Sequence, residues 1–235
     1  MTAVDLLGLP GVGPLAGDHP SVLALRAAVR GESDAPETVE GLAPALVGVL
    51  PDALEAHRAL GVGDDVTRAT LADVGRKIEA YGATVDVPWL VGLLRGDVLA
   101  LGRLQFERAV TDEGRSIHIP EGGSLRPDLV DASLAEARAA FGDGPMICTS
   151  WLLDPTLLQL PETSNIVAFA RRFDVEPTEP GHEGDEAAAK FVFRRPLAEV
   201  LDPAVVTPRT TLEHLVAEHL RAGRHWSEPK GTLRP

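Results

Sequence analysis

The stretch that decides the fold is residues 98–107, Val98-Leu99-Ala100-Leu101-Gly102-Arg103-Leu104-Gln105-Phe106-Glu107. Its second half alternates between apolar and polar residues with a period of two, which is typical of a half-buried β-strand. A turn at Thr111-Asp112-Glu113-Gly114 leads from it into the short apolar segment 116–120. The two segments are predicted to pair as a β-hairpin.

Downstream of this hairpin, helices and strands are predicted to alternate. The loop Glu121-Gly122-Gly123-Ser124 precedes a helix that Pro127 opens, and the apolar positions of this helix share one face as far as Phe141. The elements expected after it are a buried strand, a helix, an acidic loop, a further strand and a terminal helix, over residues 146–153, 164–173, 174–188, 190–195 and 211–222.

Upstream of residue 82 the pattern is helical throughout. Apolar residues recur at helical spacing in segments separated by glycine and proline, over residues 20–30, 42–50, 51–60 and 65–81. We therefore expect an α/β (α+β) fold in three parts. These are a small helical N-terminal domain, a domain with a mixed central sheet flanked by helices, and a C-terminal helix with a polar tail, over residues 1–84, 85–200 and 201–235.

The composition is that of a folded, soluble protein, with 44% hydrophobic and 24% charged residues. The net charge of −13 repels nucleic acid and anionic membranes at long range, so neither is an expected partner. The first twenty residues do not have the pattern of a secretory signal, and no apolar run approaches the roughly 18 residues that a membrane helix needs. We expect a cytoplasmic protein whose oligomeric state the sequence does not indicate.

No metal site is expected from the cysteine and histidine pattern. The single cysteine, Cys148, excludes an intramolecular disulfide and a thiolate metal cluster of the usual kind. His214 and His219 are five residues apart and do not form a His-Glu-x-x-His motif. Cys148 lies in an apolar run, so we expect it to be a buried small hydrophobe rather than a nucleophile.

Four short motifs carry a resemblance to a known family. They are Gly102-Arg103-Leu104-Gln105-Phe106-Glu107, His118-Ile119-Pro120, Ser150-Trp151-Leu152-Leu153-Asp154-Pro155 and Ser164-Asn165-Ile166. In this order and spacing the chain resembles an actinobacterial family of acyltransferase domain proteins, which join a helical N-terminal domain to a GNAT-like (N-acetyltransferase-like) C-terminal domain. The resemblance covers about residues 85–196. It implies a GNAT-like fold that uses acyl-CoA as a substrate.

The resemblance also indicates which residues would bind coenzyme A. In GNAT-type proteins the glycine loop offers backbone N–H groups to the pyrophosphate, and the next helix points its positive end at it. The matching positions are Gly122, Gly123 and Ser124. Asn165 lies where the superfamily's last cofactor-contacting helix carries asparagine, and Arg172 belongs to one of the densest basic pairs. The structural alternatives are a glycine turn, a helix N-cap and a solvated face.

Two further positions bear on this loop. Glu121 stands at its mouth and would repel a phosphate unless the side chain turns away. The superfamily often uses a tyrosine as general acid, but the only tyrosine here, Tyr81, lies far upstream in the sequence.

Acyl transfer to an amine needs a base and a hydrogen-bond donor that faces the developing oxyanion. Glu107 and His118, on the two predicted strands, are the candidates for the base, and Ser150 is a candidate polar contact in the cleft. Alternatively, Glu107 pairs with a neighbouring arginine and His118 faces solvent.

Three functions are therefore consistent with the sequence. The first is acyl transfer from a CoA thioester to an amine or hydroxyl of a small-molecule or carrier-bound metabolite, as a biosynthetic step. The second is a GNAT-like fold adapted to another reaction on a pathway intermediate, since fold alone does not determine chemistry. The third is a non-catalytic binding protein that keeps the cleft.

Overall fold

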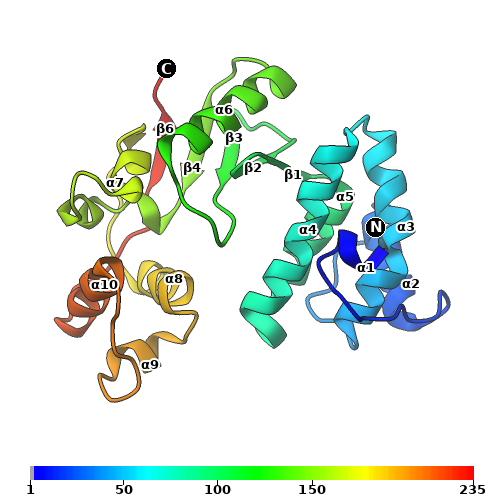
Figure 1. Ribbon diagram of the computed structural model, residues 1–235, viewed down its shortest axis with the longest axis horizontal. Helices are drawn as coiled ribbons and strands as arrows, with labels where there is room; N and C mark the ends of the chain where they lie inside the picture. Colours follow the sequence, from blue (N-terminus) through cyan, green and yellow to red (C-terminus); the bar gives the residue numbers. More distant parts are fainter. Residues whose placement is uncertain (1–2) are drawn as a thin grey trace. The chain divides into compact units, whose positions relative to one another are not determined.

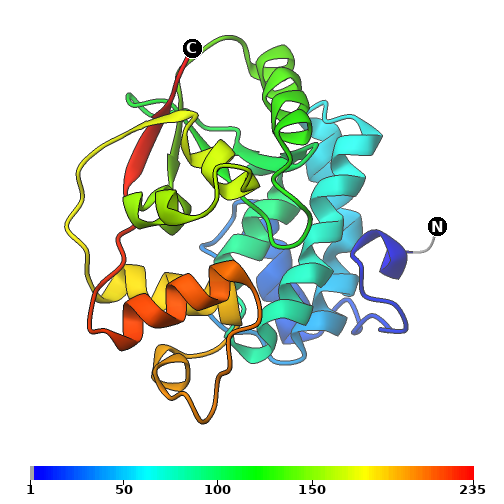
Figure 2. The same cartoon turned by 60° about the vertical axis from the view of Figure 1, so that its left-hand side comes forward.

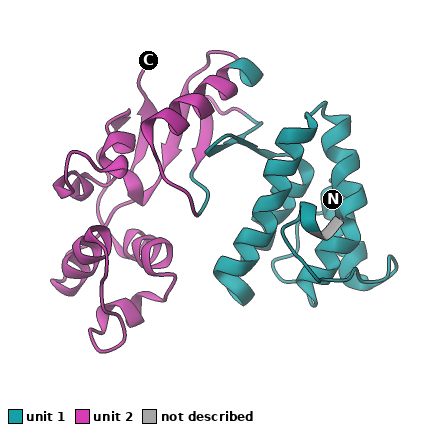
Figure 3. Cartoon of the chain, viewed as in Figure 1, with its two compact units in different colours: residues 1–109, 119–121, 139–141 teal, residues 110–118, 122–138, 142–235 magenta. Residues whose placement is uncertain are grey.

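The computed structural model describes residues 3–235, and the chain divides into two compact units (Figure 3). Unit 1 comprises residues 1–109, 119–121 and 139–141, and unit 2 comprises residues 110–118, 122–138 and 142–235. The predicted fold class is confirmed, because a helical N-terminal part precedes an α/β part with a mixed set of strands. Within the described residues no helix is both long and apolar enough to cross a membrane.

Unit 1 is a set of packed helices followed by a β-hairpin (Figure 1). Its elements are α1 (Ala3–Leu6), α2 (Pro20–Val29), α3 (Leu42–Ala59), α4 (Asp64–Tyr81), a 3₁₀ turn (Gly82–Thr84), α5 (Val87–Arg95), β1 (Val98–Leu101) and β2 (Leu104–Glu107). Leu25, Leu46, Leu71 and Leu90 are fully buried where α2, α3, α4 and α5 meet. Burying one such side chain contributes about 1.5–3 kcal/mol, so the aliphatic stripes hold this bundle together.

Two predictions for unit 1 were wrong in detail. Residues 42–50 and 51–60 form one helix, α3, with Pro51 inside it, because the apolar face continues across the proline. Residues 98–107 form two strands rather than one, because β1 pairs antiparallel with β2 and Leu101 stands opposite Leu104. Gly102 adopts a left-handed φ of 63°, which allows a two-residue turn that a single continuous strand would not contain.

Unit 2 contains four paired strands and the remaining helices. Its elements are β3 (Arg115–His118), α6 (Pro127–Phe141), β4 (Met146–Thr149), 3₁₀ turns (Trp151–Leu153 and Pro155–Gln159), α7 (Asn165–Ala170), β5 (Phe173–Val175), α8 (His182–Phe193), α9 (Leu197–Leu201), α10 (Thr211–Arg221) and β6 (Lys230–Leu233). The strand order is β3-β4-β6-β5. β3 and β4 run parallel, whereas β6 is antiparallel to both of its neighbours. The strand β6 was not predicted, since it is short and depends on its partners for pairing.

The prediction of a strand at residues 190–195 was wrong. This segment ends α8, which packs beside α10 (Figure 2). The window 190–195 looks strand-like by itself, but it continues a helix that has acidic residues in its first turn and buries Ala187, Ala188 and Ala189. The acidic loop expected at residues 174–188 is correspondingly shorter, because β5 and α8 take its two ends.

Candidate functional site

The N-terminus of α6 and the glycine loop before it form the first part of the site. Gly122 and Gly123 have φ values of 79° and 73°, and a Cβ atom added at Gly122 would meet nothing within 4 Å. Arg126 at the N-cap of the 15-residue helix α6 makes no side-chain capping hydrogen bond. A glycine loop next to the positive end of a helix dipole favours an anion at this position.

Asn165 reaches this loop from α7. Its side-chain amide donates a hydrogen bond of 2.7 Å to the hydroxyl of Ser124. The helix N-cap is Ser164, whose hydroxyl accepts from the backbone of Ile166 at 3.3 Å. Ser164 therefore caps α7, and the side chain of Asn165 contacts the loop.

Two arginines gather at the first turn of α6, and both are held by acids. Arg172 forms an ion pair with Asp131 and donates to the carbonyl of Pro127 at 3.4 Å. Arg126 contacts both oxygens of Asp128, at 3.0 and 2.6 Å, and this hydrogen bonding lowers the pKa of the Asp128 carboxyl. Unit 2 thus brings together five of the sequence-predicted residues, which are Gly122, Gly123, Ser124, Asn165 and Arg172.

Glu121 turns toward α4 within unit 1. Lys77 Nζ lies 2.9 Å from Oε1 and 2.7 Å from Oε2 of Glu121, and the hydroxyl of Tyr81 donates to Oε1 as well. Burial opposes ionisation of this carboxyl, but the contacts with Lys77 and Tyr81 outweigh it and hold the Glu121 pKa below its usual range. Glu121 and Tyr81 are 40 residues apart in the sequence, but the structure joins them in one hydrogen-bonded group with Lys77.

The two predicted bases belong to different units. Glu107 ends β2 in unit 1, and His118 ends β3 in unit 2. Both side chains are half-buried. Each stays a separate prediction for the base.

Ser150 and Cys148 lie at the end of β4. The Ser150 hydroxyl accepts from the backbone of Leu152 at 3.1 Å, and its backbone N–H donates to the carbonyl of Pro229 at 3.2 Å. Cys148 is 1% exposed, and burial raises the pKa of its thiol to about 12. The thiol is therefore protonated at neutral pH, as expected for a buried hydrophobe.

Sequence reasoning missed a carboxylate–imidazole pair in unit 2. Asp185 in α8 accepts from His225 Nδ1 at 2.6 Å and from the backbone N–H of Trp226 at 2.8 Å. Glu228 lies nearby in sequence, and burial together with the charge of Glu183 raises the pKa of its carboxyl. No local pattern marks these residues, because they come from segments forty residues apart that were interpreted as a loop and a tail.

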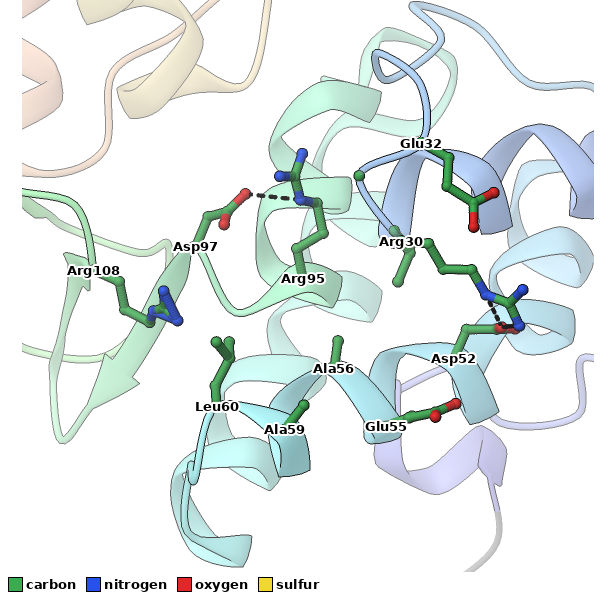
Figure 4. Close-up of a pocket in the computed structure, with 12 residues that line it drawn as sticks. Arg30, Glu32, Asp52, Glu55, Ala56, Ala59, Leu60, Arg95, Asp97 and Arg108 are labelled. Carbon is green, nitrogen blue, oxygen red and sulfur yellow. Dashed lines mark hydrogen bonds and ion pairs between the residues drawn. The ribbon is translucent and has the colours of Figure 1, made fainter.

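A hollow of about 690 Å³ lies in unit 1, on the side of α3 and α5 (Figure 4). Ion pairs line it, including Arg30 with Asp52 at 2.6 Å and Arg95 with Asp97 at 3.2 Å. None of the sequence-predicted site residues contributes to its lining.

Family models match both parts of the chain. Residues 20–92 match the N-acyltransferase N-terminal domain, and residues 98–233 match the GNAT-like C-terminal domain. The helical part and the α/β part thus define a GNAT-like acyltransferase. Because the second match spans more than half of the chain, the chain belongs to the family with the GNAT-like C-terminal domain. No curated protein sequence shows significant similarity to it.

Solved acyltransferase structures resemble nearly the whole chain. One, described as an acyltransferase in complex with decanoyl-CoA and teicoplanin, is 29% identical with a TM-score of 0.79, over 98% of this chain and 85% of that chain. Another, an acyltransferase in complex with decanoyl-CoA, is 31% identical with a TM-score of 0.74, over 99% and 84%. A third, in complex with CoA and 10C-teicoplanin, is 29% identical with a TM-score of 0.79, over 98% and 86%. The chain is an acyltransferase by both fold and family.

Proposed function

We propose that this acyltransferase moves an acyl group from an acyl-CoA thioester to an amine or hydroxyl of a small-molecule or carrier-bound metabolite. The observation that carries the proposal is the similarity of 98% of the chain to an acyltransferase in complex with decanoyl-CoA and teicoplanin. The relatives support a medium-chain acyl donor in particular, since decanoyl-CoA and octanoyl-CoA are the acyl-CoA ligands in their descriptions.

Coenzyme A would be held at the N-terminus of α6. The backbone N–H groups of Gly122, Gly123 and Ser124, beside the positive end of α6, suit pyrophosphate oxygens, which accept hydrogen bonds and carry negative charge. Arg172 would add charge at the same turn, by exchanging part of its contact with Asp131 for a phosphate oxygen. Asn165 would keep Ser124 and the loop in place through their shared hydrogen bond.

Transfer would proceed by direct attack of the acceptor on the thioester carbonyl. A base removes the proton of the attacking group, and hydrogen-bond donors stabilise the oxyanion. Glu107 and His118 are the bases that the sequence predicts, and Ser150 would be a polar contact at the end of β4.

The first test is thermal unfolding with CoA, acetyl-CoA and decanoyl-CoA, because a ligand that binds the native state raises the midpoint. We expect saturable shifts that are largest for decanoyl-CoA. Arg172→Gln should reduce them, whereas Arg138→Gln at the other end of α6 should not. The proposal would be wrong if millimolar decanoyl-CoA left the midpoint unchanged.

The second test follows CoA release from decanoyl-CoA with amine acceptors such as glucosamine and teicoplanin, in wild type, Glu107→Gln and His118→Ala. Acceptor-dependent release is the expected result. If the acceptor is carrier-bound, CoA should instead be released only when the acceptor amine is attached to a carrier protein.

A further inference from the structure

The segment 225–228, between α10 and β6, is held by two buried aspartates. Asp185 accepts from His225 Nδ1 and from the backbone of Trp226. Asp154 accepts from both the backbone and the hydroxyl of Ser227, at 2.8 and 2.6 Å. Both aspartates are buried, with Asp185 4% and Asp154 3% exposed. The segment is therefore fixed on both sides of Trp226.

Close packing makes this placement rigid. A Cβ added at Gly184 would lie 2.2 Å from the carbonyl oxygen of Trp226, so only glycine allows α8 to approach so closely. The N–H of Gly181 donates to the same oxygen at 2.9 Å. The fully buried Trp226 ring packs edge-on against Trp151, with 6.2 Å between the ring centroids.

His225 stays accessible within this rigid setting. Its side chain is 59% exposed, although its partner Asp185 is only 5% exposed. The carboxylate accepts from Nδ1, which selects the imidazole tautomer whose Nε2 carries a lone pair. A buried carboxylate that orients an exposed imidazole is a general-base arrangement.

A purely structural role does not account for the whole pair. The Asp185 Oδ1 contact with the Trp226 backbone already fastens the segment to α8. The contact between Oδ2 and His225 adds a titratable group that is open to solvent. An ion pair with an exposed side chain contributes little to stability. The contact between Asp185 and the His225 ring does, however, define the direction in which Nε2 points.

The chain that follows His225 reaches the end of β4 that carries Ser150. The Ser150 N–H donates to the carbonyl of Pro229, and the backbone of Trp151 hydrogen-bonds to Glu228. Both contacts lie within unit 2 and place the segment that begins at His225 beside the residues that follow β4.

We propose that Asp185 and His225 form the acid–base dyad of acyl transfer, with His225 Nε2 as the base in place of Glu107 or His118 and Asp185 as its positioning residue. This assignment rests on the acyl-transfer function proposed above. His225 takes the proton that the acceptor amine loses as its nitrogen forms the amide bond to the thioester carbon. The C–S bond breaks, and the proton passes from Nε2 to the departing thiolate. The products are the amide and CoA with a free thiol.

The test compares CoA release from decanoyl-CoA, with teicoplanin or glucosamine as acceptor, in wild type and variants. His225→Gln should lower kcat/KM by about 100-fold or more, the usual contribution of a general base. In wild type, kcat/KM should rise with pH as the imidazole loses its proton, and this rise should be absent in His225→Gln. His225 contacts the carboxylate of Asp185 from α8, and its backbone carbonyl accepts from His219 on α10, so Asp185→Asn should shift this limb.

The control is His182→Gln. His182, in α8, is also an exposed histidine and contacts the carboxylate of Glu186 at 3.2 Å. Its replacement should leave the rate unchanged. Added imidazole should restore activity to His225→Ala, which it cannot do if the ring only supports the fold. Decanoyl-CoA should still raise the unfolding midpoint of the His225 variants.

The outcomes separate the two proposals. Wild-type transfer with undiminished activity in His225→Gln would overturn the dyad alone, as would loss of activity in Glu228→Gln but not in His225→Gln. A wild type that neither binds decanoyl-CoA nor releases CoA would overturn the acyl-transfer function and the dyad with it.

Discussion

The side-chain amide of Asn165 donates a 2.7 Å hydrogen bond to the hydroxyl of Ser124, a residue 41 positions earlier in the chain. This bond joins the start of α7 to the glycine loop before α6. Because this hydrogen bond is exposed, it contributes little to global stability, and its main effect is to position the loop.

The first prediction concerns this bond. Asn165→Ala and Ser124→Ala should each weaken decanoyl-CoA binding by several-fold while changing the free energy of unfolding by less than about 1 kcal/mol. The double variant should lose no more affinity than the stronger single variant, since both remove the same contact. Isothermal titration calorimetry measures the affinity. Fully additive losses would show that the two residues act independently.

The second prediction concerns the half-buried ion pair of Lys77 with Glu121. Lys77→Met removes the ammonium group from the Glu121 carboxylate and keeps its hydrogen bond from the Tyr81 hydroxyl. This change should lower the free energy of unfolding by about 2 kcal/mol at pH 7. Lys77→Met combined with Glu121→Gln should recover part of this loss, because no uncompensated charge remains. Urea denaturation gives the free energies. Equal stability of Lys77→Met and wild type would contradict the prediction.

The same pair predicts a pH dependence. The pKa of Glu121 is lowered in the folded state, so the carboxylate contributes stability above its usual pKa, and that contribution is lost as pH falls through the lowered value. The stability difference between wild type and Glu121→Gln should therefore be present at pH 7 and shrink progressively as the pH falls below the usual range of a glutamate carboxyl. A difference that grew on acidification would contradict it.

The fourth prediction concerns the contact between α8 and the segment after α10. Gly184→Ala places a methyl group 2.2 Å from the carbonyl oxygen of Trp226 and should destabilise the protein by about 1–3 kcal/mol through forced displacement. Gly144→Ala is the matched control, since its added methyl would meet nothing within 4 Å, and it should change stability by about 0.5 kcal/mol at most. Equal midpoints for the two variants in thermal unfolding would contradict this account.

The fifth prediction concerns the single cysteine. Cys148 is buried and its thiol has a pKa of about 12, so the folded protein should not react with a thiol reagent such as DTNB at pH 8. One thiol per chain should react after unfolding in guanidinium chloride. Rapid reaction of the native protein would mean that the end of β4 opens.

Local patterns in the sequence predicted part of the fold well. The helices over residues 20–30, 65–81 and 211–222 correspond to α2, α4 and α10, because each has a long apolar stripe at helical spacing and recognisable end signals. The strand at residues 190–195 failed, since a six-residue window contains no information about the alanine-rich turns that precede it. The short strand β6 could not be found, because its pairing with β4 and β5 is entirely non-local.

The candidate site likewise combines residues that are neighbours in the sequence with residues that meet only in the folded chain. Gly122, Gly123 and Ser124 were predicted from a glycine loop of consecutive residues, and Asn165 from its match to the superfamily's cofactor-contacting helix. The roles of the predicted site residues stay proposals until the variants are measured. The division into parts at residues 84 and 200 also stays a prediction.

The sequence by itself determined the class of fold, the family and the elements that form through contacts between near neighbours, because helical periodicity and turn chemistry are local properties. Only the tertiary structure decided where side chains meet across the chain. It turned Glu121 toward Lys77 and Tyr81, and it placed the buried carboxylate of Asp185 against His225. Such pairings depend on which elements pack together, and packing is a property of the whole folded unit that no single segment encodes.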